Sequence, residues 1–290
     1  MVDCICLYFS VLIFGCFFAL TLAYQNIKIN KMKTKSILSK VATGVIAVFG
    51  FIALTLPVSA QTPKGIKNIV IVHGSFADAS GWEPVYDILT KDGYKVTLVQ
   101  NPTISLADDT AATNAAIERM DGPVLLVGHS WGGTVITQSG NEPQVKALVY
   151  VCAFIPDSGE STLDLASHAK PLPVQGILNP DAKGNVYLAE ATFQQTFTPG
   201  QTKEKSEFMY ASQIPYTVKS FTDKVTIAAW KNKPVYAIKP SNDGTISPTL
   251  EDMMYKRANA KVTVIKGGHT LFMDDPKAVV AVIEDAAKNN

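Results

Sequence analysis

The sequence predicts an α/β protein in which a mostly parallel sheet has helices on both faces. Short apolar runs alternate with helix-like stretches along residues 68–290, as expected when crossover helices join parallel strands. The apolar run 123–127 leads straight into Gly128-His129-Ser130-Trp131-Gly132, and a helix-like stretch follows. This order predicts a sharp strand-to-helix turn that lifts the Ser130 hydroxyl above the sheet edge. We therefore expect the functional site at the carboxyl ends of the strands.

The other elements follow from periodicity and from turn residues. Apolar runs with the length of buried strands occupy residues 68–73, 94–99, 145–154, 234–238 and 261–265. Helical periodicity or helix-forming composition marks residues 82–89, 106–120, 248–257 and a last helix that opens at Asp275-Pro276. Asp92-Gly93 and Asp121-Gly122-Pro123 end the first two of these helices.

The alternation breaks at Ile155-Pro156. From there to Lys233 the sequence is polar and rich in Pro and Gly, with helical fragments at 190–197 and 203–211. About eighty residues is too long for a plain loop in a compact domain. We therefore predict a small inserted subdomain at residues 156–233, carried by a core that consists of residues 61–155 and 234–290.

The N-terminal 60 residues have the features of export signals. Residues 32–35 are basic, residues 41–56 are apolar, and residues 57–60 form a small-residue cleavage site before Gln61, which predicts a signal peptide at 32–60. Residues 1–31 are then either an upstream extension from a wrongly chosen start codon or a transmembrane segment. Cys16 is a poor lipid-anchor site because no basic segment precedes it.

Both alternatives export the remainder. We expect a periplasmic or secreted protein that contacts a membrane only through the N-terminal segment, and only if residues 1–60 are retained. Of the 26 basic and 25 acidic residues, those 60 carry five lysines and Asp3, which leaves 21 against 24 and a net charge of −3. This balance argues against a nucleic-acid partner. The sequence makes no prediction of oligomeric state.

A single cysteine remains in the exported part. Cys4, Cys6 and Cys16 precede the predicted cleavage site, so Cys152 has no internal disulfide partner. Because Cys152 lies in an apolar run, we expect it to be inert core packing.

A serine nucleophile requires a base, and the chain offers four histidines. His73 ends a strand and His129 adjoins Ser130, which favours structural roles for both, while His168 falls in the insertion. His269 follows the last predicted strand in a Gly-rich loop, where an imidazole can reach over the sheet edge. Chain order therefore predicts His269 as the base.

The base in turn needs an orienting acid, and a developing oxyanion needs two N–H donors. Asp243 follows the strand 234–238 and is the predicted acid, with Asp157 as the reserve. The Asn-Asp-Gly sequence around Asp243 is also typical of a plain turn. The predicted oxyanion donors are the backbone N–H groups of Trp131 and of Ser75, in the loop after the first strand.

At these residues the chain resembles the α/β-hydrolase superfamily, and in particular its small bacterial serine esterases. The resemblance rests on residues 73–82, on residues 128–133, and on Asp243 with His269. It implies Ser130 as nucleophile, a cap that shapes the substrate pocket, a small-molecule ester substrate, and neither cofactor nor metal. Hydroxynitrile lyases of this group have lysine where Thr270 stands, and dehalogenases and epoxide hydrolases have aspartate in place of Ser130.

The sequence therefore predicts an exported serine ester hydrolase with Phe76, Phe154 and Trp230 as pocket walls. Other reactions on the same triad remain open, namely lactone or amide hydrolysis, C–C cleavage and acyl transfer. A binding protein without activity is the alternative of a different class.

Overall fold

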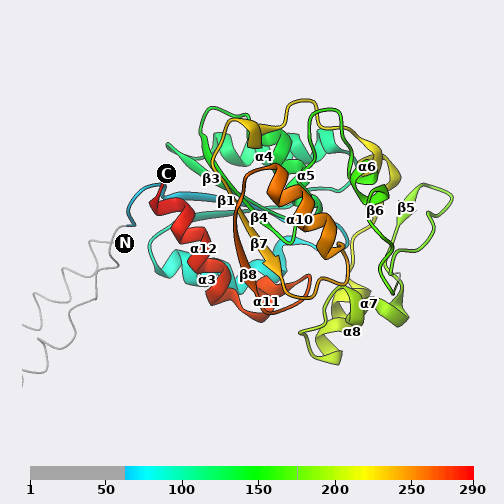
Figure 1. Cartoon of the computed structure of the whole chain (residues 1–290). Coiled ribbons are helices and arrows are strands. Elements are labelled where there is room, and N and C mark those ends of the chain that lie inside the picture. Colours follow the sequence, from blue (N-terminus) through cyan, green and yellow to red (C-terminus); the bar gives the residue numbers. More distant parts are fainter. Residues whose placement is uncertain (1–62, 175) are drawn as a thin grey trace, which may run out of the picture. The chain divides into compact units, whose positions relative to one another are not determined.

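A computed structural model describes residues 63–174 and 176–290, so the predicted leader lies outside the described residues. Six parallel strands form the central sheet in the order β2-β1-β3-β4-β7-β8 (Figure 1). Their bounds are β1 Asn68–Val72, β2 Lys95–Val99, β3 Val124–His129, β4 Val145–Val151, β7 Val235–Pro240 and β8 Lys261–Ile265. The predicted α/β class and parallel sheet are confirmed.

Helices cover both faces of this sheet. The helices of the core are α3 Glu83–Lys91, α4 Leu106–Glu118, α5 Trp131–Ser139, α10 Pro248–Arg257, the short α11 Leu271–Asp274 and α12 Pro276–Lys288. α3 and α12 pack on one face, whereas α4, α5 and α10 pack on the other. Both faces of the sheet are therefore buried.

The side chains along the central strands alternate between the two layers, as the pleat of a strand requires. In β3, Leu126 points into the layer of α4 and α5, while Leu125 and Val127 point toward α3 and α12. All three are fully buried. This double burial explains why the strand has an apolar run rather than an alternating pattern.

The insertion at 156–233 consists of short elements joined by turns. They are α6 Thr162–Ser167, β5 Asn185–Val186, α7 Glu190–Thr196, α8 Lys203–Ala211, β6 Tyr216–Thr217, α9 Val218–Thr222 and the 3-10 turn η2 Ala229–Lys231. β5 and β6 pair as a small antiparallel ribbon. The insertion starts after β4, at the carboxyl edge of the sheet beside the strand-to-helix turn that carries Ser130 (the elbow). It ends before β7 at the opposite edge, where Lys233 donates to the carbonyl of Val145, the first residue of β4.

Two boundaries differ from the sequence expectation. β4 ends at Val151, because Cys152 takes a left-handed backbone with φ of 46° and turns the chain away from the sheet. Cys152 is nevertheless fully buried, as expected of core packing. The predicted helix that starts at Trp82 begins instead as the 3-10 turn η1 Ala79–Trp82, capped by the Asp78 side chain. Within the described residues, no helix has the length and hydrophobicity to cross a membrane.

Candidate active site

Ser130 lies on the turn between β3 and α5, in a strained backbone conformation. Its φ of 52° and ψ of −120° fall in a region that residues with a Cβ seldom adopt. The flanking glycines allow this turn, since a Cβ on Gly128 would lie 2.5 Å from the Gly132 carbonyl oxygen. A Cβ on Gly132 would in turn collide with the carbonyl of Val72 in β1. The strand, turn and helix thus pack too closely for any larger residue at either position.

Ser130, His269 and Asp243 form a continuous hydrogen-bonded relay. The Ser130 hydroxyl oxygen is 2.9 Å from His269 Nε2, and His269 Nδ1 is 2.8 Å from Asp243 Oδ2. The side chains of Asp243 and His269 are fully buried. The three residues come from the ends of β3, β7 and β8, so the sheet brings together groups that are up to 139 residues apart.

Backbone N–H groups fix the orientation of Asp243. Its Oδ1 accepts hydrogen bonds from the N–H groups of Thr245 at 2.7 Å and Ile246 at 2.8 Å, which leaves Oδ2 for the imidazole. The turn chemistry of Asn242-Asp243-Gly244 and the contact with His269 therefore coexist in one residue. Asp157, the reserve acid, instead forms an ion pair with Lys231 and accepts from the Ser158 N–H.

His129 stabilises the loop that carries the base. Its Nε2–H donates to the backbone carbonyl of His269 at 3.0 Å, and its ring packs 4.8 Å from that of Phe272. Complete burial holds the pKa of His129 well below its usual value, and the nearby His269 ring acts in the same direction. His129 is therefore a neutral donor. His168 is exposed at the end of α6.

The two predicted oxyanion donors lie beside the serine. Gly74 passes so close that a Cβ there would lie 2.7 Å from Ser130 Cβ, which places the following Ser75 next to the elbow. Trp131 is the first residue of α5, where backbone N–H groups have no helical partner. Within the described residues, the N–H groups of Ser75 and Trp131 donate to no protein acceptor. Both are free to bind a substrate oxygen.

A buried network connects these two donors, and sequence analysis missed it. Asp109 Oδ2 accepts from the Trp131 indole at 2.6 Å and from Asn101 Nδ2 at 3.4 Å. The Asn101 N–H donates to His73 Nε2 at 3.2 Å, and His73 Nδ1–H donates to the Gly74 carbonyl at 2.7 Å. Burial raises the pKa of Asp109 and lowers that of His73. In the sequence, Asp109 has no distinguishing feature, because an acid in the first helical turn is normally exposed.

An apolar cavity of about 330 Å³ opens above Ser130. It lies between the elbow and the insertion, and Ser75 and Trp131 belong to its wall. Phe76 and Phe154 also line it, as predicted. No Asp, Glu, Lys, Arg or His among the described residues contributes to this wall. The cavity therefore suits an uncharged, apolar molecule.

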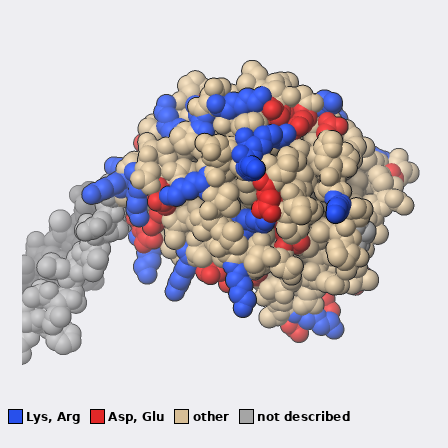
Figure 2. Space-filling view, in the orientation of Figure 1, with Lys and Arg blue, Asp and Glu red and all other residues tan. Residues whose placement is uncertain are grey.

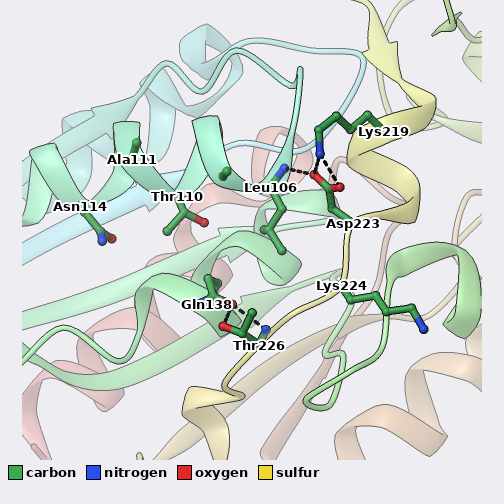
Figure 3. A pocket seen from close by; sticks show the side chains of 10 residues that line it. Leu106, Thr110, Ala111, Asn114, Gln138, Lys219, Asp223, Lys224 and Thr226 are labelled. Carbon is green, nitrogen blue, oxygen red and sulfur yellow. Dashed lines mark hydrogen bonds and ion pairs between the residues drawn. The ribbon is translucent and has the colours of Figure 1, made fainter.

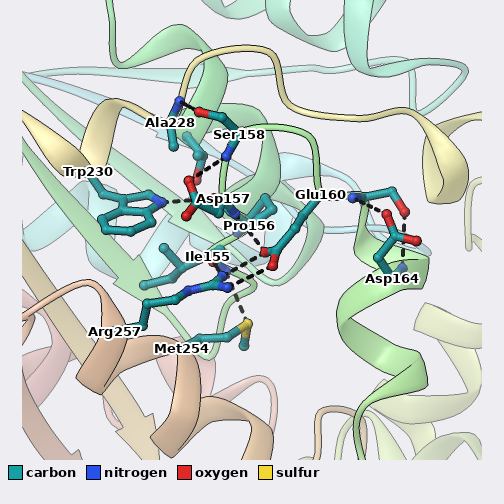
Figure 4. Close-up of polar contacts among 12 residues, drawn as sticks. Ile155, Pro156, Asp157, Ser158, Glu160, Asp164, Ala228, Trp230, Met254 and Arg257 are labelled. Atoms are coloured by element: carbon teal, nitrogen blue, oxygen red, sulfur yellow. Dashed lines mark hydrogen bonds and ion pairs between the residues drawn. The ribbon is translucent and has the colours of Figure 1, made fainter.

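Trp230 does not line the cavity, so that expectation is wrong. Its indole N–H donates to the Pro156 carbonyl at 2.8 Å, and its ring packs against Arg257 (Figure 4). The Lys231 ammonium lies 5.4 Å from the centre of the same ring. Trp230 thus holds together the two ends of the insertion. The sequence could not separate this role from pocket lining, because both place an aromatic residue near the ends of the strands.

A larger cavity of about 530 Å³ lies between α4, α5 and α9 (Figure 3). Its charged groups are already paired, with Lys219 bonded to Asp223 and Asp223 bonded to the Leu106 N–H. Gln138 accepts from Thr226 across the same groove. No residue of the relay lines this groove, so size does not identify the functional cavity here.

Lys and Arg side chains alternate with Asp and Glu over the face shown in Figure 2, and the region formed by α6 and β5 carries few charges. Four large apolar side chains among the described lining residues of the cavity are exposed, namely Leu163, Ile177, Leu178 and Val218.

This fold and site define a hydrolase of the α/β class. The chain belongs to the α/β hydrolase family, whose pattern it matches over residues 69–282. The resemblance to the α/β-hydrolase superfamily is thereby confirmed.

Individual relatives lie within this family. A carbendazim hydrolyzing esterase of Nocardioides sp. (strain SG-4G) is 29% identical over 121 residues, which are 37% of this chain and 50% of that esterase. The chain therefore spans about half the length of that relative. The α/β hydrolase nvfD of Aspergillus novofumigatus (strain IBT 16806) is 23% identical over 242 residues, 76% of this chain and 96% of that protein.

A solved structure shows the same fold. The pyrethroid hydrolase from Sphingobium faniae JZ-2 superposes with a TM-score of 0.67 at 17% identity, over 77% of this chain and 97% of that one.

Proposed function

We propose that this chain is a serine hydrolase that cleaves carboxylic esters through an acyl-enzyme intermediate. The observation that carries the proposal is the buried relay Ser130–His269–Asp243, with contacts of 2.9 and 2.8 Å. Such a relay supplies both the base that a serine hydroxyl needs and the acid that orients the base. The uncharged cavity and the carbendazim hydrolyzing esterase among the relatives support an ester as the substrate.

In the first half-reaction, Ser130 Oγ attacks the ester carbonyl carbon while His269 Nε2 takes the hydroxyl proton. Asp243 accepts from Nδ1–H and stabilises the imidazolium. The carbonyl oxygen becomes negative and is bound by the N–H groups of Trp131 and Ser75, each worth about 3 kcal/mol of transition-state stabilisation. His269 then protonates the leaving alcohol, and the acyl group stays on Ser130.

The second half-reaction releases the acid. Water enters where the alcohol left, gives a proton to His269 Nε2 and attacks the acyl carbon. The same oxyanion donors stabilise the second tetrahedral intermediate. Collapse returns the proton from His269 to Ser130 Oγ, which restores the free enzyme.

Hydrolysis of p-nitrophenyl esters from acetate to palmitate tests this proposal, with Ser130→Ala as the control. A cavity of about 330 Å³ is at the small end for ligand sites, so we expect short and medium acyl chains to react fastest. Turnover must disappear in Ser130→Ala. If no ester is turned over but a fluorophosphonate labels Ser130, the reaction is instead lactone hydrolysis, amide hydrolysis or acyl transfer on the same triad. Absence of both turnover and labelling would refute the proposal.

Export is a separate part of the proposal. It rests on the order of the basic, apolar and small-residue segments in 32–60, which precede the described residues. An exported enzyme of this kind would meet its esters in the periplasm or outside the cell.

A further inference from the structure

The wall of the active-site cavity contains a tyrosine whose ring is rigidly placed. Tyr216 lies in β6 of the insertion and is only 4% exposed. Its ring centroid is 5.3 Å from that of Trp131, 5.7 Å from Phe76 and 5.9 Å from Phe221. Trp131 and Phe76 belong to the segments that supply the oxyanion donors. The phenol is thus fixed over the elbow by aromatic contacts on three sides.

The phenol oxygen of Tyr216 is buried and has no hydrogen-bond partner within the described residues. The Thr162 side chain acts on the phenol as a weak hydrogen-bond partner and opposes the rise of its pKa. The contact falls short of a regular hydrogen bond, and the Thr162 hydroxyl is already bonded to Thr134 at 2.9 Å. A buried hydroxyl without a partner is costly and rare in native structures. The oxygen therefore requires an explanation.

Apart from Ser75, for whose hydroxyl the described residues provide no bonded partner, the other hydroxyl groups of the wall are already engaged. Thr162 bonds to Thr134, and Ser130 bonds to His269. The remaining threonine hydroxyls donate to backbone carbonyls, those of Thr222 and Thr245. Among the described lining residues, Tyr216 alone has a fully buried side-chain oxygen that awaits a partner.

The group that is missing is a hydrogen-bond acceptor. Burial raises the pKa of Tyr216 well above its usual range, and the carboxylates of Asp109 and Asp223 act in the same direction. The phenol therefore keeps its proton at any working pH and is available as a donor. No charged side chain among the described residues lines the cavity, so an anionic ligand would find no counter-ion in that part of the wall.

We propose that the cavity selects esters that carry, besides the scissile carbonyl, a second uncharged acceptor such as an ether or carbonyl oxygen, and that Tyr216 Oη–H binds this acceptor. The inference rests on the proposed function of Ser130. The rest of the substrate is apolar, because aromatic and aliphatic side chains form the other walls. Tyr216 is a specificity-determining residue in this account and takes no part in proton transfer.

Matched esters and Tyr216→Phe test the proposal on the protein expressed from its full-length gene. On the acyl side, p-nitrophenyl hexanoate is compared with a series of analogues, each of which has one methylene group replaced by an ether oxygen. On the alcohol side, hexyl acetate is compared with its oxa analogues by following acid release. The ratio of variant to wild-type kcat/KM is taken for each ester, which cancels the intrinsic reactivity of the substrate.

The loss of one hydrogen bond predicts that Tyr216→Phe lowers kcat/KM about tenfold for at least one oxa ester. The parent ester should change less than threefold. Tyr187→Phe, a partly exposed tyrosine of the insertion outside the cavity, should leave every ratio near one. Equal losses on all esters, or no loss on any, would overturn the inference.

These outcomes differ from failure of the proposed function. If wild-type protein hydrolyses none of the esters and a fluorophosphonate leaves Ser130 unmodified, the proposed function fails and this inference falls with it. If hydrolysis depends on Ser130 but Tyr216→Phe does not distinguish the esters, only the role of Tyr216 is refuted. Equal rates of fluorophosphonate labelling in wild type and Tyr216→Phe establish that the variant is folded.

Discussion

At the scale of single residues, a second carboxylic acid is buried close to Asp243. Glu251 in α10 is fully buried, its Oε1 accepts from the Tyr255 hydroxyl at 3.2 Å, and its Oε2 has no partner among the described residues. Burial and the charge of Asp243 raise the pKa of Glu251 to about 9, while Lys239 opposes this rise. Glu251 is therefore neutral at pH 7.

This neutral acid makes stability depend on pH in a definite direction. In the unfolded chain Glu251 titrates near 4.5, so between pH 4.5 and about 9 folding binds a proton and stability falls as the pH rises. The slope is at most about 1.4 kcal/mol per pH unit. We predict that Glu251→Gln flattens this slope and stabilises the protein at pH 8. Urea unfolding of both proteins at pH 6, 7, 8 and 9 measures the effect, and parallel curves would contradict it.

The Asp109 network gives a second prediction at this scale. Asp109→Asn removes one acceptor between the Trp131 indole and Asn101, so both oxyanion donors lose support. Loss of an oxyanion donor typically lowers kcat by a factor of 10²–10³. In Asp109→Asn the donors are displaced rather than lost, so we expect kcat to fall less, by about 10- to 100-fold. KM should stay within about threefold. Steady-state kinetics on one ester measure the effects on kcat and on KM separately. The control is Asp108→Asn, a substitution of the exposed neighbouring residue. A change confined to KM would contradict the positioning role.

At the scale of elements, a clasp joins the two ends of the insertion (Figure 4). Arg257 of α10 binds Glu160 through two nitrogens at 2.8 Å each and also donates to the Ile155 carbonyl. The Ala228 N–H donates to Ser158 Oγ at 3.0 Å. The Arg257 contacts tie the chain entering the insertion to α10, and the Ala228 contact ties that chain to the chain leaving the insertion. Together they restrain both ends of the segment that forms most of the cavity wall.

Arg257→Met should loosen this clasp, because Glu160 and the Ile155 carbonyl lose their partner. For these partly buried groups we expect a loss of about 1–2 kcal/mol in the free energy of unfolding. Amide exchange should become faster in segments 156–161 and 225–231, as read by mass spectrometry. The adjacent exposed substitution Lys256→Met should change neither quantity. Unchanged exchange in Arg257→Met would mean that the clasp does not restrain the insertion.

Elements differ in how far the sequence determined them. The central strands and α12 were predictable, because local periodicity reports burial directly. β5 and β6 were not, since each has only two residues and is fixed by its partner. The positions of Ser130, His269 and Asp243 followed from chain order. The pairing of Asp109 with Trp131 and the orphan oxygen of Tyr216 depend on contacts between distant segments, which leave no local pattern.

At the scale of the whole molecule, the fold explains how distant segments form one site. Parallel strands place the ends of β1, β3, β7 and β8 at one edge of the sheet, and the loops that follow them carry Ser75, Ser130, Asp243 and His269. The insertion after β4 covers that edge and supplies most of the cavity wall. The sheet thus positions the loops, the loops carry the site residues, and the insertion forms most of the cavity wall.

The N-terminal segment gives a prediction at this scale. If residues 32–60 form a signal peptide, the exported protein should begin at Gln61. Intact-mass measurement of protein recovered from a bacterial periplasm or medium tests this cleavage. Recovery of the unprocessed chain in the membrane fraction would instead indicate a retained anchor.

The central claim is that Ser130 is the nucleophile, activated by His269 and Asp243. Peptide mapping by mass spectrometry after reaction with a fluorophosphonate tests it most directly. We predict one phosphonyl group on the peptide that contains Ser130, no adduct in Ser130→Ala, and labelling slowed by orders of magnitude in His269→Ala and Asp243→Asn. An adduct on another residue, or folded wild-type protein that remains unlabelled, would contradict the account.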